Sequence, residues 1–597
     1  MTFFWSQRTA AAFLAALLAT ASGLADADEP VKELHYILPA AETSLDPAIG
    51  RDLYTAQITQ PIFETLYTYD YMARPAKVVP STATAMPEIS ADGKTYTIHL
   101  KKGILFTEDP AFGGKRRELT MQDYVYSWER FFDPRLASPD SWLFEGKIVG
   151  LDQAVASAKK NNKFDYDSKV AGFEVVDRYT LRLHLTHADF NLAMIMAHYP
   201  TGAIAREVVE KYGDSKTEVA SHPVGTGIYK LGEWVRGSKI VLEENKDHRT
   251  EIWDFQAGSD PDDQRIVAQM KGKKMPQIGR IVLNVVLEDQ SRWLGFQSGD
   301  TDLFWLDGPL ALKAIKDGKL LPELVAKGVQ LSRIADPEIS YYYWNMRDPV
   351  LGGFSKEKIA LRRAIAMAHN IDEEISVVWN GQAVKLEYPI PPGVVGYDPN
   401  YRSLLQYDPE LANKLLDKYG YKLGADGFRT LPDGKPLVLH YTSRNESNGV
   451  LQAEMWRKTY NRIHIHMIND RMIFTDIQKE EKNCRLQSRT SPWLADYPDG
   501  DNFMQLFYGP NIHQQNNGCY QSPQYDKWYE ASQKLPDGPE RDALYHQMTR
   551  QMEVDGATLI GYARYRNMLA NKAVLGYKKH PILTQEFQYI DIDRSKK

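Results

Sequence analysis

Patterns typical of strands alternate with patterns typical of helices along this chain, and that alternation constrains its fold more than any other feature. Residues 95–100 and 179–185 place an apolar side chain at every second position, as half-buried strands do. Residues 120–132, 359–369 and 408–419 instead place their apolar side chains on one helical face. No internal repeat interrupts this alternation, which disfavours a solenoid or a propeller. The pattern predicts a mixed α/β protein.

Length and charge narrow the class of protein further. At 597 residues, the chain is long enough for two to four domains. Hydrophobic residues make up 43% and charged residues 25%, which is ordinary for a folded globular protein and excludes disorder of the whole chain. The formal net charge of −6 is the opposite of the basic footprint that a dedicated nucleic-acid binder needs. We therefore expect no nucleic-acid partner.

The first 27 residues read as an export signal. Arg8 is followed by an apolar run over residues 10–19, and small side chains stand at Ala25 and Ala27. This order of charged, apolar and small residues is typical of a cleavable signal peptide. The apolar run is shorter than the roughly 20 residues that a membrane-spanning helix needs. We expect cleavage near Ala27 and a mature protein that is free in an exported aqueous compartment.

The chain holds two cysteines, Cys484 and Cys519. In an oxidising compartment two such residues are more often paired than free, so we predict a disulfide. The alternative is a pair of buried thiols that never meet. A zinc site needs about four ligands, and no nearby cysteine or histidine spacing supplies them.

Motifs for catalysis are missing. The sequence contains neither a G-x-S-x-G nucleophile turn nor an H-E-x-x-H zinc helix. His464 and His466 could share one strand face, but no third ligand accompanies them, which favours ordinary strand histidines over a metal site. We expect no catalytic residues, no metal and no cofactor, although the residues of a triad can be dispersed in sequence.

Six segments, in order along the chain, together resemble one family. Residues 223–229 (PVGTGIY) are similar to its P-x-G-T-G-P-Y segment, and residues 493–503 (WLADYPDGDNF) to its W-x-x-D-Y-x-D-P-x-x-F stretch. The other four are residues 44–47 (SLDP) with 62–66 (IFETL), 80–100 continuing through 119–130 (LTMQDYVYSWER), 298–303 (SGDTDL) and 361–372 (LRRAIAMAHNID). The family is that of the solute-binding proteins of peptide ABC importers, the oligopeptide/dipeptide group called solute-binding protein family 5.

The resemblance implies a periplasmic-binding-protein-like (type II) fold of two lobes, with an extra domain inserted in the first. We expect the core of lobe 1 at residues 28–72, 218–338 and 565–597, the inserted domain at 73–217 and lobe 2 at 339–564. The chain would cross between lobes near residues 337–341 and 561–565. Residues 251–275 depart from the family as an insertion, and their charged part, 256–274, reads as a solvated loop.

The same resemblance implies a function and a set of ligand-binding residues. Asp496 matches the carboxylate that takes the α-ammonium of a peptide, and Trp493 matches an aromatic wall of the pocket. Glu42 and Thr43 resemble a segment that pairs with the ligand backbone. Further predicted ligand contacts stand in a glycine-rich turn, where a backbone can approach closely; these are Thr226 and Gly227. We expect a monomeric, non-enzymatic peptide carrier that delivers its ligand to an inner-membrane ABC permease.

Other functions stay open at this point. A binder of the same fold could carry another solute, such as a metal chelate, haem or glutathione. From different classes, the chain could be an exported hydrolase or an exported chaperone that uses an open cleft. The local residues around Asp496 would also suit a plain solvated turn.

Overall fold

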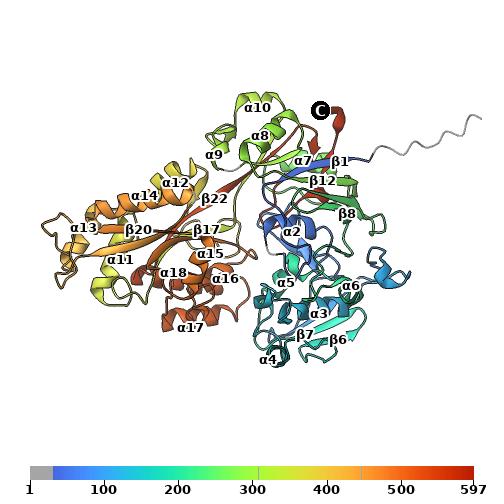
Figure 1. The fold of residues 1–597 in the computed structure, drawn as a ribbon, viewed down its shortest axis with the longest axis horizontal. Coiled ribbons are helices and arrows are strands. Elements are labelled where there is room, and N and C mark those ends of the chain that lie inside the picture. Colours follow the sequence, from blue (N-terminus) through green and yellow to red (C-terminus); the bar gives the residue numbers. More distant parts are fainter. Residues whose placement is uncertain (1–30, 51, 307, 446, 597) are drawn as a thin grey trace, which may run out of the picture.

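The chain folds into two lobes joined by long strands (Figure 1). The structure is a computed structural model, and it describes residues 31–50, 52–306, 308–445 and 447–596. The expected signal peptide and its cleavage point at Ala27 lie outside the described residues. Within the described part, no helix combines the length and the apolar character needed to cross a membrane. The two-lobed α/β architecture is the one that the sequence predicts.

One strand, β22 (Thr558–Ala570), belongs to both lobes. Its first half pairs with β17 (Glu338–Trp344) and β18 (Ala383–Lys385) of lobe 2. Its second half pairs with β13 (Leu303–Leu306) and β16 (Gln330–Ala335) of lobe 1. The partners change between Arg564 and Tyr565, so the chain passes from one lobe to the other at that point. The exact domain limits stay a prediction.

Lobe 1 is built on the part of the ten-stranded sheet that continues from β22 through β13. Beyond β13 the order runs through β1 (Glu33–Leu38), β12 (Arg280–Val285), β9 (Lys239–Glu244) and β8 (Tyr229–Val235). Its helices are α2 (Leu53–Thr59), α7 (Asp263–Met270), α8 (Asp289–Ser298), α9 (Gly308–Ala311) and α10 (Pro322–Ala326). Small strand pairs complete it: β2 (Tyr67–Tyr69) with β3 (Val78–Pro80), β10 (Glu251–Ile252) with β11 (Lys274–Met275), β14 (Ile315–Lys316) with β15 (Lys319–Leu320), and β23 (Val574–Leu575) with β24 (Asp591–Ile592).

A smaller domain adjoins lobe 1 and has its own four-stranded sheet (Figure 1). The sheet consists of β4 (Glu88–Ile89), β5 (Thr95–His99), β7 (Thr180–His184) and β6 (Phe173–Asp177), with helices α3 (Met121–Glu129), α4 (Leu151–Asn161), α5 (Leu192–Ile195) and α6 (Arg206–Tyr212). A fully buried ion pair ties this domain to the lobe 1 core: Arg130 donates to both carboxylate oxygens of Asp46, at 3.0 and 2.6 Å. Asp46 also accepts from the backbone of Val219. Three distant segments therefore meet at one charge pair.

Lobe 2 packs helices on both faces of its part of the sheet. Every residue of β17 is buried, and alternate side chains reach opposite cores. Tyr342 and Trp344 pack with Leu361 on one face, whereas Ile339 and Tyr341 pack on the other. The remaining elements are β19 (Val438–Arg444), β20 (His466–Met472), β21 (Ser488–Leu494), α11 (Lys356–Ala368), α12 (Ile371–Trp379), α13 (Pro409–Lys418), α14 (Ser447–Arg462), α15 (Phe474–Lys482), α16 (Asp501–Met504), α17 (Pro523–Ser532) and α18 (Pro539–Asp555).

The elements expected from periodicity are present. The strands expected at 95–100 and 179–185 are β5 and β7, and the three expected helices are α3, α11 and α13. The solvated loop expected over residues 256–274 is wrong in part. This stretch contains α7, whose Ile266 and Met270 are buried, and Asp263 forms a buried ion pair with Lys578. Its charged residues therefore include a partner for a lysine far along the chain.

The predicted disulfide is confirmed. Cys484 and Cys519 are bonded, with their Cα atoms 6.1 Å apart. Their separation of 35 residues means that the bond closes a loop containing β21 and α16.

Removing this disulfide should destabilise lobe 2. For a loop of this length the chain-entropy model gives about 3–4 kcal/mol of stability. We expect the double variant Cys484→Ala/Cys519→Ala to unfold at lower urea concentration, with a free energy of unfolding lower by up to that amount. Thiol titration of the denatured, unreduced wild type should find no free thiol. Two free thiols, or equal stability of the variant, would contradict the prediction.

Candidate ligand-binding site

A cavity of about 670 Å³ lies between the inserted domain and lobe 2. Three other cavities, of about 340, 580 and 520 Å³, are each lined by lobe 1 residues. The larger cavity is lined from both lobes, by Trp142, Glu145, Gly146, Lys147, His187 and Ala188 on one side and by Trp493, Asp496, Tyr497, Asp501, Gln505, Tyr508, Asn511, Gln514, Gln515, Tyr529, Glu530, Gln533 and Lys534 on the other. A ligand there would touch both lobes at once.

The lobe 2 wall begins where β21 ends. This strand is terminal in the main sheet and runs antiparallel to β17, with Glu338 opposite Leu494. Ala495 still donates its backbone N–H to Pro337 O, at 2.8 Å, and the chain then leaves the sheet. Trp493 and Asp496, which the sequence predicts as ligand contacts, are half-buried at this exit and line the cavity together.

A buried asparagine orients both residues. Asn502, on α16, accepts hydrogen bonds at its Oδ1 from Trp493 Nε1, at 2.9 Å, and from the backbone N–H of Asp496, at 3.1 Å. Its Nδ2 donates to Asp496 Oδ2, at 3.2 Å. Sequence reasoning missed Asn502. Its position six residues after Asp496, at the start of a short helix, was the available signal, because a buried amide can satisfy several loop groups at once.

An acidic cluster lies behind this wall. Asp499 pairs with Arg541 at 2.7 Å, and Asp501 accepts hydrogen bonds from the hydroxyls of Tyr497 and Tyr529, each at 2.6 Å. Burial raises the pKa of Asp499 to about 6, against the opposing effect of Arg541. Both carboxylates are buried, so nearby donors are needed to hold their charge.

The inserted domain reaches this cluster across the cavity. Asn191 Nδ2 donates to Asp499 Oδ1 at 3.5 Å and to Asp501 Oδ2 at 3.4 Å. The backbone N–H of Asn191 is held by Asp189 Oδ1, and the other carboxylate oxygen of Asp189 pairs with Lys147 at 2.8 Å. These contacts join the two lobes beside the cavity, so opening the cavity must break them.

The other predicted ligand contacts lie elsewhere in lobe 1 and do not line this cavity. Glu42 accepts from Trp234 Nε1 and the backbone of Gly237, and Thr43 binds the side chains at the start of α2. Thr226 is buried, and Gly227 lies against the chain's own backbone, since a Cβ there would stand 2.2 Å from Pro61 O. For these four residues, ligand contact stays a prediction.

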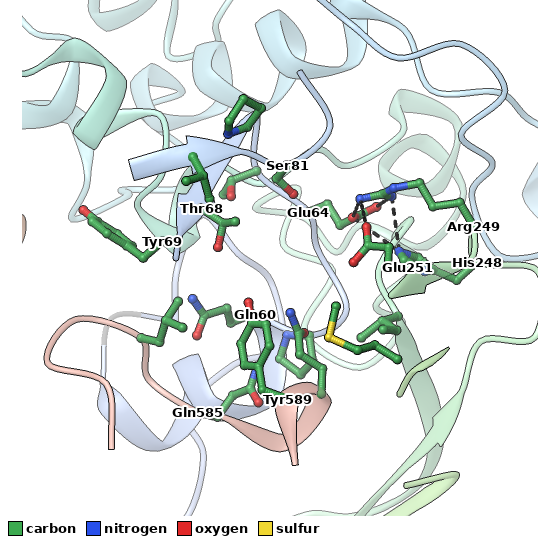
Figure 2. Close-up of a pocket in the computed structure, with 18 of the residues that line it drawn as sticks. Gln60, Glu64, Thr68, Tyr69, Ser81, His248, Arg249, Glu251, Gln585 and Tyr589 are labelled. Atoms are coloured by element: carbon green, nitrogen blue, oxygen red, sulfur yellow. Dashed lines mark hydrogen bonds and ion pairs between the residues drawn. The ribbon is translucent and has the colours of Figure 1, made fainter. Parts of the chain in front are cut away.

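A second polar cavity, of about 340 Å³, holds a group of residues with metal-ligating side chains (Figure 2). The ligand atoms of Glu64, His248 and Glu251 lie within 4.8 Å of one another. Arg249 bridges the two carboxylates, at 2.7 and 2.6 Å, so a positive charge already occupies the centre of the group. Although burial alone would raise it, Arg249 and His248 lower the pKa of Glu64 to about 2. The two carboxylates of the group are therefore held in an ion-pair network with Arg249.

Comparison with known proteins gives a consistent result. The family model described as "Bacterial extracellular solute-binding proteins, family 5 Middle" matches residues 77–515. The chain is 25% identical over 547 residues to the periplasmic oligopeptide-binding protein OppA of Salmonella typhimurium, covering 89% of this chain and 87% of that protein. It is 23% identical over 531 residues to the dipeptide-binding protein of Escherichia coli, covering 87% and 86%.

Solved structures share the fold. The ABC transporter-associated periplasmic binding protein DppA from Helicobacter pylori, in complex with the peptide STSA, superposes with a TM-score of 0.70 at 22% identity. The match covers 94% of this chain and 98% of that chain.

The raised pKa of Asp499 should appear in the stability of the protein. This carboxyl takes up a proton on folding between its unfolded pKa, near 3.9, and about 6. The wild type should therefore lose stability relative to Asp499→Asn as the pH rises from 4 to 7, by up to about 3 kcal/mol. Urea unfolding at several pH values measures this difference. Asp372 is exposed, and the control variant Asp372→Asn should show the same dependence of the free energy of unfolding on pH as the wild type. If Asp499→Asn also shows the same dependence as the wild type, the raised pKa of Asp499 is refuted.

Proposed function

Because this chain belongs to the family 5 bacterial extracellular solute-binding proteins, we propose that it is the peptide-binding subunit of an ABC importer. It works in the periplasm as a monomer, closes its two lobes on a peptide and presents the closed form to an inner-membrane permease. It is a carrier and not an enzyme. The observation that carries this proposal is the placement of Trp493 and Asp496, at the end of the terminal strand β21, on a cavity lined by both lobes.

The strand edge suits a peptide backbone. A terminal strand presents N–H and C=O groups that an extended peptide can pair with, whatever its sequence. Pro492 and Leu494, near the end of β21, are exposed on either side of Trp493. A peptide added along this edge would enter the cavity at Asp496. This mode of binding accounts for capture of peptides that differ in side chains.

Asp496 supplies the charge that a peptide amino terminus requires. An α-ammonium group has an unperturbed pKa near 7.7–8.0, and a neighbouring carboxylate keeps it charged when it leaves water. Trp493 adds apolar area, and its ring face can attract the same cation. Asn502 holds the two side chains in a fixed relation, so the site need not be ordered when a ligand arrives.

A permease can distinguish the ligand-bound protein from the empty one by the closure of its lobes. Asn191 already bridges the inserted domain to Asp499 and Asp501, and a ligand in the cavity adds contacts from both lobes to the same closed arrangement. A ligand shifts such an equilibrium only through contacts that differ between the two states. A ligand that touches both lobes has that property, since its contacts with the second lobe exist only when the lobes are closed.

The lining of the cavity supports binding over hydrolysis. Within the described residues it holds glutamines, tyrosines, acids and lysines, and no serine, threonine or cysteine that could act as a nucleophile. Binders of a metal chelate, haem or glutathione remain the alternative on the same fold. Native mass spectrometry of gently purified protein separates these: a ladder of peptide masses supports the proposal, and a single metal-chelate or porphyrin mass would overturn it.

Removing the charge of Asp496 should weaken peptide binding. Asp496→Asn keeps the shape of the side chain but takes away the partner of the peptide ammonium. We expect calorimetry with a short free-amine peptide to show a loss of at least about 2 kcal/mol, within the range for breaking a buried charge pair.

An N-acetylated peptide is the matched control. It lacks the ammonium group, so it should bind the wild type poorly. The substitution Asp496→Asn should lower the affinity for this peptide only slightly further. Equal binding of the free-amine peptide by wild type and variant would show that Asp496 does not hold the amino terminus.

Closure can be tested apart from ligand contacts. Asn191→Asp would face a third carboxylate toward Asp499 and Asp501, and like charges repel strongly in a buried cluster. We expect the peptide affinity of Asn191→Asp to be about tenfold lower than that of the wild type, or lower still. Asn191→Ala only removes the hydrogen-bond donor, so its affinity should fall less. Small-angle scattering with peptide should show a larger open fraction for Asn191→Asp. Unchanged affinity and scattering would contradict a role for this bridge in closure.

A further inference from the structure

A third cavity, of about 520 Å³, lies inside the inserted domain and is separate from the cavity between the lobes. It is bounded by α3, by α6 and by the chain segment that leads into β6. Its lining contains five acids, Asp123, Glu129, Asp167, Glu207 and Glu210, and three bases, Arg117, Lys169 and Arg206. The peptide-binding proposal makes no use of this cavity.

Four of the five acids are already paired. Arg117 binds Asp123 and Glu207, at 2.6 and 2.8 Å, and Arg206 binds Asp167 and Glu210, each at 2.7 Å. Each of these two guanidinium groups thus already binds two carboxylates, so neither arginine is a dedicated partner for a fifth acid.

Glu129 is the exception. It is 3% exposed and lines the cavity, yet no hydrogen bond or ion pair joins its side chain to another residue that the structure describes. It is also the last residue of α3, where the helix dipole disfavours a carboxylate. Neither helix stability nor a structural ion pair therefore explains a buried acid at this position.

Aromatic and apolar side chains make up the rest of the lining, apart from Gln122 and Ser168. Tyr126 and Tyr166 lie with their ring centroids 4.9 Å apart, and Val170 and Phe173 are buried beside them. A buried acid in a cavity that also presents aromatic rings matches an organic cation, because the ammonium meets the carboxylate and its hydrocarbon body meets the rings. From this geometry we propose that the cavity binds a small primary amine, with Glu129 as the counter-ion of its ammonium group.

The titration of Glu129 provides a readout of binding. Burial raises its pKa to about 8, with Arg206 opposing and Asp165 reinforcing the shift. The other charged groups that line the cavity are Asp123 on α3, Arg206, Glu207 and Glu210 on α6, and Arg117, Asp167 and Lys169 on the flanking segments, and Asp165 acts on Glu129 from outside the lining. At pH 7 the free site therefore holds a protonated carboxyl, and capture of an ammonium ion ionises it and releases up to one proton.

The experiment uses n-butylammonium as the probe and the full-length Asp496→Asn protein as the background, because Asp496 in the peptide site could also attract an amine. Calorimetry at pH 7 in two buffers of different ionisation enthalpy measures affinity and proton release. We expect saturable binding with proton release, and a loss of at least tenfold when Glu129→Gln is added. Glu88→Gln, which removes an exposed acid of the same domain, should change nothing.

The outcomes are distinct. Failure of the Asp496→Asn protein to bind n-butylammonium, or equal binding after Glu129→Gln, would overturn the proposal. Binding that appears only after Lys169→Met would overturn it too, because this lysine of the lining would then fill the site itself. Equal melting temperatures of Glu129→Gln and its parent would show that the variant is folded. Since Glu129 lies in a cavity that shares no lining residue with the interlobe cavity, the loss caused by Glu129→Gln tests this site whether or not the peptide proposal holds.

Discussion

The structure depends on one strand that both lobes share. β22 pairs with β17 and β18 in its first half and with β13 and β16 in its second half. Each lobe is hydrogen-bonded to its own half of this strand. The lobes can therefore rotate about the point between Arg564 and Tyr565, where the pairing strands change, while the hydrogen bonds within each half stay intact. A cavity between lobes joined in this way can open and close while both cores stay intact.

The proposed binding site lies at the terminal strand of this sheet. With β22 and β17 in the interior of the sheet, β21 becomes terminal, and its last residues reach the space between the lobes. Asn502 then holds Trp493 and Asp496 to one another, and the acids behind them meet Asn191 of the opposite lobe. The proposed ligand contacts and the bridge between the lobes therefore lie on the same short stretch, residues 493–502. The disulfide between Cys484 and Cys519 encloses this stretch.

Much of the fold could be predicted from the sequence, because the local physics is strong there. The period-two apolar pattern of β5 and the one-sided pattern of α13 follow from burial of one face, and Asp408 caps that helix as its side chain chemistry suggests. The disulfide followed from two cysteines and an oxidising compartment. By contrast, the charge of residues 256–274 wrongly predicted a solvated loop throughout, because Asp263 forms an ion pair with Lys578, more than 300 residues away in the sequence.

For the site, the sequence by itself determined which side chains could recognise a peptide amino terminus, since Asp496 and Trp493 stand in a recognisable motif. Only the tertiary structure decided where these two side chains lie. It placed them on an interlobe cavity, added Asn502 and Asn191, and left Glu42, Thr43, Thr226 and Gly227 away from that cavity. It also left Glu129 without a partner among the described residues. The reason is physical: pairing and burial of charges depend on contacts between segments hundreds of residues apart, which no local pattern records.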